Sequence, residues 1–77
     1  MTDTDIEARI RTVYAARDAR GAGDLSIALR FRTQKPLTYR GVVDLVTRVV
    51  GKPRDEVAEV WEELMQAADA DDSRSDR

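Results

Sequence analysis

The sequence contains no cysteine and no histidine. Without cysteine the chain cannot form disulfides or use a thiolate nucleophile, and without either residue it lacks the usual ligands of a zinc site. The absence of histidine also removes imidazole as an acid–base catalyst near neutral pH. We therefore expect no metal ion and no other cofactor.

Long apolar runs are absent as well. No stretch approaches the roughly 20 apolar residues that a membrane-spanning helix needs. The acidic residues 1–5 lack the apolar core of a signal peptide. A chain of 77 residues has room for one domain only, which we place at residues 1–69. We expect a soluble, cytoplasmic protein with no membrane partner.

The first segment has the pattern of an amphipathic helix. Thr4 and Glu7 have the S/T-x-x-E spacing of a capping box, which indicates a helix start. Apolar residues then recur at helical spacing, at Ile6, Ile10, Val13 and Tyr14. We expect this helix to end at Gly21-Ala22-Gly23, because glycine readily adopts the left-handed conformation of a helix C-cap.

The next segment, residues 24–33, fits two structures. Leu25, Ile27, Leu29 and Phe31 alternate with more polar residues, and a period of two is typical of a half-buried strand. Asp24 is also a good helix N-cap, and residues 25, 28, 29 and 32 share one helical face. We expect a helix here and keep a short strand at residues 25–32 as the alternative.

Two further helices follow the connector that contains Pro36. Thr38 is a cap residue in front of an apolar series that continues to Val50, and Gly51 closes that helix. Pro53 then marks the start of a last helix, whose apolar stripe is Val57, Val60, Trp61, Leu64 and Ala68. The fold class is therefore all-α, with three to four short helices and a helix-turn-helix-like hairpin. We expect residues 70–77 to form a disordered acidic tail.

Charge is segregated along the chain, although the net charge is only −2. Residues 30–54 carry seven cations and a single acid, Asp44, whereas residues 55–77 carry nine acids and two cations. A basic stretch on structured elements is typical of a surface that binds phosphate groups. The alternative is that these cations pair with the acids of the last helix. The candidate nucleic-acid-binding residues are Arg30, Arg32, Lys35, Arg40, Arg48, Lys52 and Arg54.

Residues 25–65 resemble the helix-turn-helix core of small prokaryotic or phage regulators, including the winged-helix type. The resemblance is carried by Leu37-Thr38-Tyr39-Arg40 and by the segment from Val49 to Val57, where a helix ends at a glycine and a second begins. In that family the second helix reads base edges in the major groove. Here its outward face is acidic, so phosphate contacts would come instead from Lys52, Arg54, Arg40 and Lys35.

The strand alternative gives a second resemblance, to the ribbon-helix-helix regulators. In that family two chains pair their strands, and the outward side chains of the ribbon enter the major groove. The corresponding positions in this chain are Ser26, Ala28, Arg30 and Arg32. The acidic helix would then lie in the dimer core, with only its start near phosphate.

Binding is the function that these patterns favour. Paired carboxylates occur only on an exposed helix face and in the tail, where nothing desolvates them enough for acid–base catalysis, so we expect no enzyme. The first hypothesis is a small, dimeric DNA-binding regulator or accessory factor. The second is a protein-interaction module that engages a basic protein surface with Glu56, Glu59, Glu62, Glu63 and Trp61. Trp61 also fits a purely structural position in the core.

Overall fold

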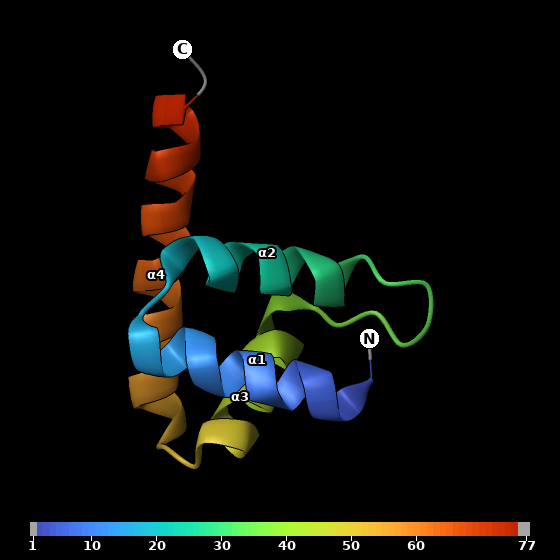
Figure 1. The fold of residues 1–77 in the computed structure, drawn as a ribbon. Helices are drawn as coiled ribbons and strands as arrows, with labels where there is room; N and C mark the ends of the chain where they lie inside the picture. The colour runs from blue at the N-terminus through green and yellow to red at the C-terminus, as the bar shows by residue number, and fades with distance from the viewer. Residues whose placement is uncertain (1, 76–77) are drawn as a thin grey trace.

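The computed structural model describes residues 2–75, and for the side chains residues 2–70. Four helices make up the fold: α1 (Asp3–Ala16), α2 (Ala19–Arg30), α3 (Tyr39–Val50) and α4 (Arg54–Ser75). In Figure 1, α1 and α2 run side by side in opposite directions, and the long α4 stands across one end of them. The described part of the chain has no strand, which confirms the all-α class. None of its helices is both long and apolar enough to cross a bilayer.

Helix α1 begins earlier than its sequence pattern predicts. The predicted capping box at Thr4 and Glu7 is wrong, because Thr2 and Asp5 form one instead. The Asp5 N–H donates to Thr2 Oγ1 at 3.2 Å, and the Thr2 N–H donates to Asp5 Oδ2 at 3.3 Å. Aspartate at the third helical position accepts the same bond that glutamate would, so the box closes two residues earlier.

The boundary between α1 and α2 lies at Arg17 and Asp18, and the predicted end at residues 21–23 is wrong. Arg17 adopts the left-handed conformation (φ 52°) without being glycine, and Asp18 caps α2 by accepting from the Gly21 N–H at 3.1 Å. Gly21 therefore lies inside a helix. A Cβ there would be 3.1 Å from Val13 Cγ2 and 2.5 Å from Asp18 Oδ2, so close approach explains the glycine.

The alternation in residues 25–32 does not come from a strand. Leu25 and Leu29 are buried one turn apart on α2, whereas Ile27 and Phe31 are 59% and 75% exposed on its outer side. Two solvent-facing apolar residues thus produce a period of two within a helix. The expected N-cap at Asp24 and the alternative strand are both wrong. Because the ribbon-helix-helix resemblance depends on that strand, the structure does not support it.

Helix α3 has the predicted limits. Thr38 caps it by accepting from the Gly41 N–H at 3.1 Å, and Gly51 ends it with φ 68°, a conformation that favours glycine. Helix α4 begins at Arg54, directly after Pro53. Its backbone continues to Ser75, into the segment where the sequence predicts a tail.

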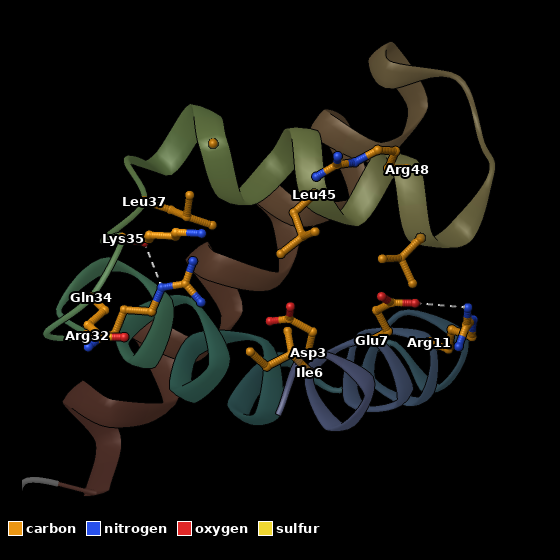
Figure 2. Close-up of a pocket in the computed structure, with 12 residues that line it drawn as sticks. Asp3, Ile6, Glu7, Arg11, Arg32, Gln34, Lys35, Leu37, Leu45 and Arg48 are labelled. Atoms are coloured by element: carbon orange, nitrogen blue, oxygen red, sulfur yellow. Dashed lines mark hydrogen bonds and ion pairs between the residues drawn. The ribbon is translucent and has the colours of Figure 1, made fainter. Parts of the chain in front are cut away.

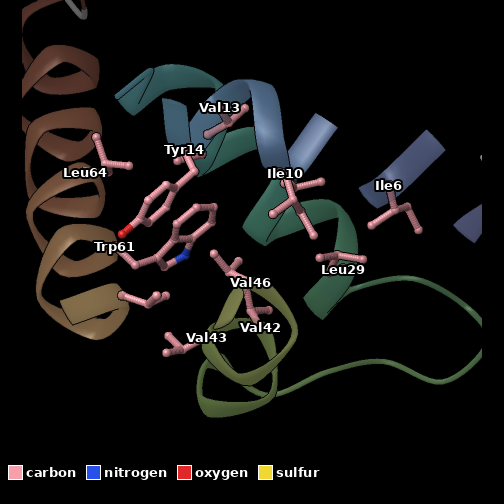
Figure 3. Close-up of a cluster of buried hydrophobic side chains, with 13 residues drawn as sticks. Ile6, Ile10, Val13, Tyr14, Leu29, Val42, Val43, Val46, Trp61 and Leu64 are labelled. Carbon is pink, nitrogen blue, oxygen red and sulfur yellow. The ribbon is translucent and has the colours of Figure 1, made fainter. Parts of the chain in front are cut away.

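Trp61 lies in the centre of a single core to which all four helices contribute (Figure 3). Its side chain is fully buried, and its indole N–H donates to Ser26 Oγ at 3.0 Å, which joins α4 to α2. Ser26 is the buried polar residue among those described, so the bond satisfies two groups that would otherwise lack a partner. The buried apolar residues are Ile6, Ile10, Val13, Tyr14, Ala22, Leu25, Leu29, Val42, Val43, Val46, Val57, Trp61 and Leu64.

Tyr14 packs beside Trp61, and its buried hydroxyl has no hydrogen-bond partner among the described residues. The guanidinium of Arg17 lies 4.4 Å from the centre of the Tyr14 ring, in cation–π geometry. The ring therefore stabilises the core through its apolar surface, whereas the hydroxyl carries the cost of desolvation.

Two conservative substitutions separate these contributions. We expect Ser26→Ala to lower the free energy of unfolding by about 1–3 kcal/mol, because it leaves the buried Trp61 N–H without an acceptor. Tyr14→Phe removes only the unpaired hydroxyl and serves as the matched control, with no expected loss of stability. Urea unfolding followed by tryptophan fluorescence measures both. Equal stability of Ser26→Ala and the wild type would contradict the role of the bond.

Candidate functional site

A groove with a volume of about 910 Å³ lies between α1 and α3. The loop formed by residues 31–38 closes one end of it, as Figure 2 shows. Three of the predicted phosphate-binding residues come together there: Arg32 and Lys35 from the loop, and Arg48 from α3. The sequence did not single out the fourth cation, Arg11, which α1 contributes.

Hydrogen bonds within the loop hold its two cations at the groove. The Arg32 Nε–H donates to the carbonyl oxygen of Lys35 at 2.7 Å, and Lys35 itself has a left-handed backbone (φ 52°). The Leu37 N–H donates to the Leu29 carbonyl oxygen at 3.0 Å, which ties the end of the loop to α2. The loop is thus a closed, internally bonded turn rather than an extended connector.

The groove combines an apolar floor with charged walls. Its apolar residues are Ile6, Leu37, Leu45 and Val49, and Gly41 leaves the α3 wall open where a side chain would stand. Two acids, Asp3 and Glu7, also line it. Glu7 lies 3.6 Å from Arg11 in an exposed i, i+4 ion pair, so these two charges largely offset each other. Three cations and Asp3 then remain, which leaves the groove positive.

The other predicted cations lie outside the groove. Arg54 is engaged by Asp44, whose Oδ1 is 2.6 Å from the Arg54 Nε. Arg40 is exposed on α3, and Lys52 lies in the turn before α4. The guanidinium of Arg30 lies 5.7 Å from the centre of the Phe31 ring at the end of α2. Three cations of the basic segment therefore line one groove, and the others lie singly outside it.

Among the described side chains, the cations of residues 30–54 do not pair with the acids of α4. Between described side chains the ion pairs are Glu7–Arg11 and Asp44–Arg54, and neither includes an acid of α4. Figure 1 gives the spatial reason, because α4 and the loop 31–38 lie on opposite sides of the molecule. The groove cations therefore lie apart from the acids of α4, whereas Lys52 and Arg54 of the basic segment lie at the start of α4.

The outer face of α4 is acidic, as its sequence predicts. Trp61 cannot take part in an interaction on that face, because it is fully buried. Tyr39 belongs to this side of the molecule, since burial and the nearby charge of Glu62 raise the pKa of its phenol above the usual value. The exposed acids of α4 among the described side chains are Asp55, Glu56, Glu59, Glu62, Glu63 and Asp69.

The chain shows no match in comparisons with known proteins. No family model, no curated protein and no solved structure matches it. Helices α3 and α4 do follow each other across the short turn 51–53, in the order that a helix-turn-helix requires. The assignment to helix-turn-helix regulators stays a prediction.

The pKa of Tyr39 reports on the charge of the α4 face. In a Tyr14→Phe background, so that Tyr39 is the remaining phenol, we expect Glu62→Gln to lower the Tyr39 pKa towards its usual value of 10.0. A phenolate absorbance titration measures this shift. Glu59→Gln removes the same charge from the same helix and is the matched control. An unchanged Tyr39 pKa in Glu62→Gln would contradict the proximity of the two groups.

The raised pKa of Tyr39 also makes the free energy of unfolding depend on pH. Because the folded pKa of Tyr39 is raised, the stability that its neutral phenol contributes is fully present below about pH 10. It is lost as the pH rises through the folded pKa. We expect Tyr39→Phe to abolish this part of the alkaline loss of stability, as measured by urea unfolding across that range.

Proposed function

We propose that the protein is a small, non-enzymatic DNA-binding regulator or accessory factor that contacts the phosphate backbone through the groove cations. The observation that carries this proposal is the convergence of Arg32, Lys35 and Arg48. They come from two elements, line one groove, and have no carboxylate partner among the described side chains. Like charges that line one groove repel each other, and they attract a ligand of opposite sign.

The position of α4 is compatible with this mode of binding. DNA that approaches the loop 31–38 and the α1–α3 side meets the cations while the acids of α4 remain on the opposite side. Exposed charges separated by more than about 8 Å are largely screened at physiological ionic strength. Insertion of α4 into the major groove would instead press its exposed carboxylates against phosphates.

The chemistry of the groove predicts the character of the binding. Arginine forms paired hydrogen bonds with phosphate oxygens, and lysine adds a compact charge. Such contacts position a protein on the backbone but do not read the base sequence. Arg40 and Lys52 are exposed elsewhere on the basic segment and add to the attraction at longer range. We therefore propose strong dependence on salt and weak dependence on sequence for these contacts.

The second candidate is a protein-interaction module that uses the acidic face of α4. The specific observation in its favour is that Glu56, Glu59, Glu62 and Glu63 are all exposed, with no cation paired to them among the described side chains. Such a face complements a basic protein surface. It does not compete with the groove, because the two lie on different sides of the molecule.

The salt dependence of DNA affinity tests the first candidate. We expect Lys35→Ala/Arg48→Ala to reduce the slope of log K against log salt by about 1.4–1.8, because each phosphate contact contributes roughly 0.7–0.9. Fluorescence anisotropy with a labelled oligonucleotide at several salt concentrations measures the slope. Arg32 is left intact, since its side chain also holds the loop.

The matched control is Arg9→Ala/Arg20→Ala, which removes two exposed cations that do not line the groove. Its net charge changes by the same amount, so it should retain most of the wild-type slope. Equal slopes for the two double variants would mean that net charge alone attracts DNA. The absence of any DNA binding at low salt would refute the proposed function.

A further inference from the structure

Phe31 is a large apolar side chain that the core does not use. It caps the end of α2 with its ring 75% exposed, and Ile27 is 59% exposed one turn earlier. Burial of a phenylalanine side chain in the core would stabilise the fold, and this exposed position makes little use of that contribution. The hydrogen bonds that hold the loop 31–38 do not involve the Phe31 ring. The fold of the loop therefore does not explain why this ring is exposed.

The surroundings of the Phe31 ring are cationic. Its neighbours in the chain are Arg30 and Arg32, and the guanidinium of Arg30 lies 5.7 Å from the ring centre. Arg32 points back to the groove, where it meets Lys35. Phe31 is thus the first residue of the loop 31–38, which carries two of the groove cations that we propose contact phosphate.

We infer that Phe31 stacks on an unpaired nucleobase, so that the ligand of this site is single-stranded DNA. The inference rests on the proposed function, and it specifies the form of DNA. An aromatic side chain beside a positively charged groove is the arrangement by which proteins hold single strands, with bases on the ring and phosphates on the cations. The bases of a duplex are already stacked on each other and leave the ring unused.

Charge argues against a second copy of the chain as the occupant of this patch. Symmetric dimers bring the same surface of each copy together. A dimer centred on Phe31 would therefore place Arg30 and Arg32 of both chains against each other, with no acid of the loop to offset them. A nucleotide strand supplies both an apolar ring face and the opposite charge.

Binding to matched single-stranded and double-stranded probes tests the inference. The probes are a labelled oligothymidylate and a duplex of the same length, titrated with the full chain at low salt. We expect the single strand to bind more tightly than the duplex. Phe31→Ala should weaken single-strand binding about 5- to 150-fold, the range for loss of one stacked base, without changing the salt slope. Phe31→Trp should retain the affinity.

Ile27→Ala is the matched control, because it removes an exposed apolar side chain of the same helix that cannot stack on a base. It should bind the single strand within about twofold of the wild type, because it removes no base-stacking contact. Circular dichroism checks that both variants are folded, and the high exposure of the two residues makes unfolding unexpected.

The outcomes separate this inference from the proposed function. A failure of both probes to bind at low salt refutes the proposed function itself. Salt-dependent binding that prefers the duplex, or that is the same for Phe31→Ala and the wild type, overturns the stacking role alone. Self-association of the wild type that Phe31→Ala abolishes in sedimentation equilibrium also overturns it, and assigns the ring to a dimer contact.

Discussion

The contact between Trp61 and Ser26 fixes how α4 lies on the other helices, and the rest of the surface depends on that placement. A fully buried indole needs an acceptor for its N–H, and Ser26 on α2 supplies one at 3.0 Å. Trp61, Val57 and Leu64 are buried, and Val60 and Met65 are partly buried against the core, so the exposed positions of α4 lie on its outer side. Those positions carry the acids. The burial of Trp61 and its neighbours on α4 therefore determines which side of the molecule is negative.

The sequence predicts the limits of a helix well only where the capping residues and the apolar periodicity indicate the same limits. Thr38 and Gly51 bound a continuous apolar series, and α3 has the expected limits. The boundary of α1 and α2 was missed because a non-glycine residue, Arg17, adopts the left-handed conformation and Asp18 then caps α2. Glycines inside α2 looked like a turn, although close packing explains Gly21. Such packing depends on tertiary contacts that the sequence alone does not reveal.

The sequence predicts seven phosphate-binding cations, and the structure places three of them at one groove. Counting charges along residues 30–54 could not show that Asp44 engages Arg54, because the pair spans two helices. It also could not show that Arg11 joins Arg32 and Arg48 at one groove, since that requires the packing of α1 against α3. The exposure of Phe31 was hidden for a similar reason, because its alternation with neighbours resembled a strand.

The central claim is that one side of the molecule binds nucleic acid while the α4 side does not. Chemical-shift mapping by NMR on the isotope-labelled protein tests it most directly, with titration of a short single-stranded oligonucleotide at low salt. The largest amide shifts should fall in residues 30–38 and around Arg11 and Arg48, and the amides of residues 55–66 should change little. Dominant shifts along α4, or no shifts at all, would contradict the claim.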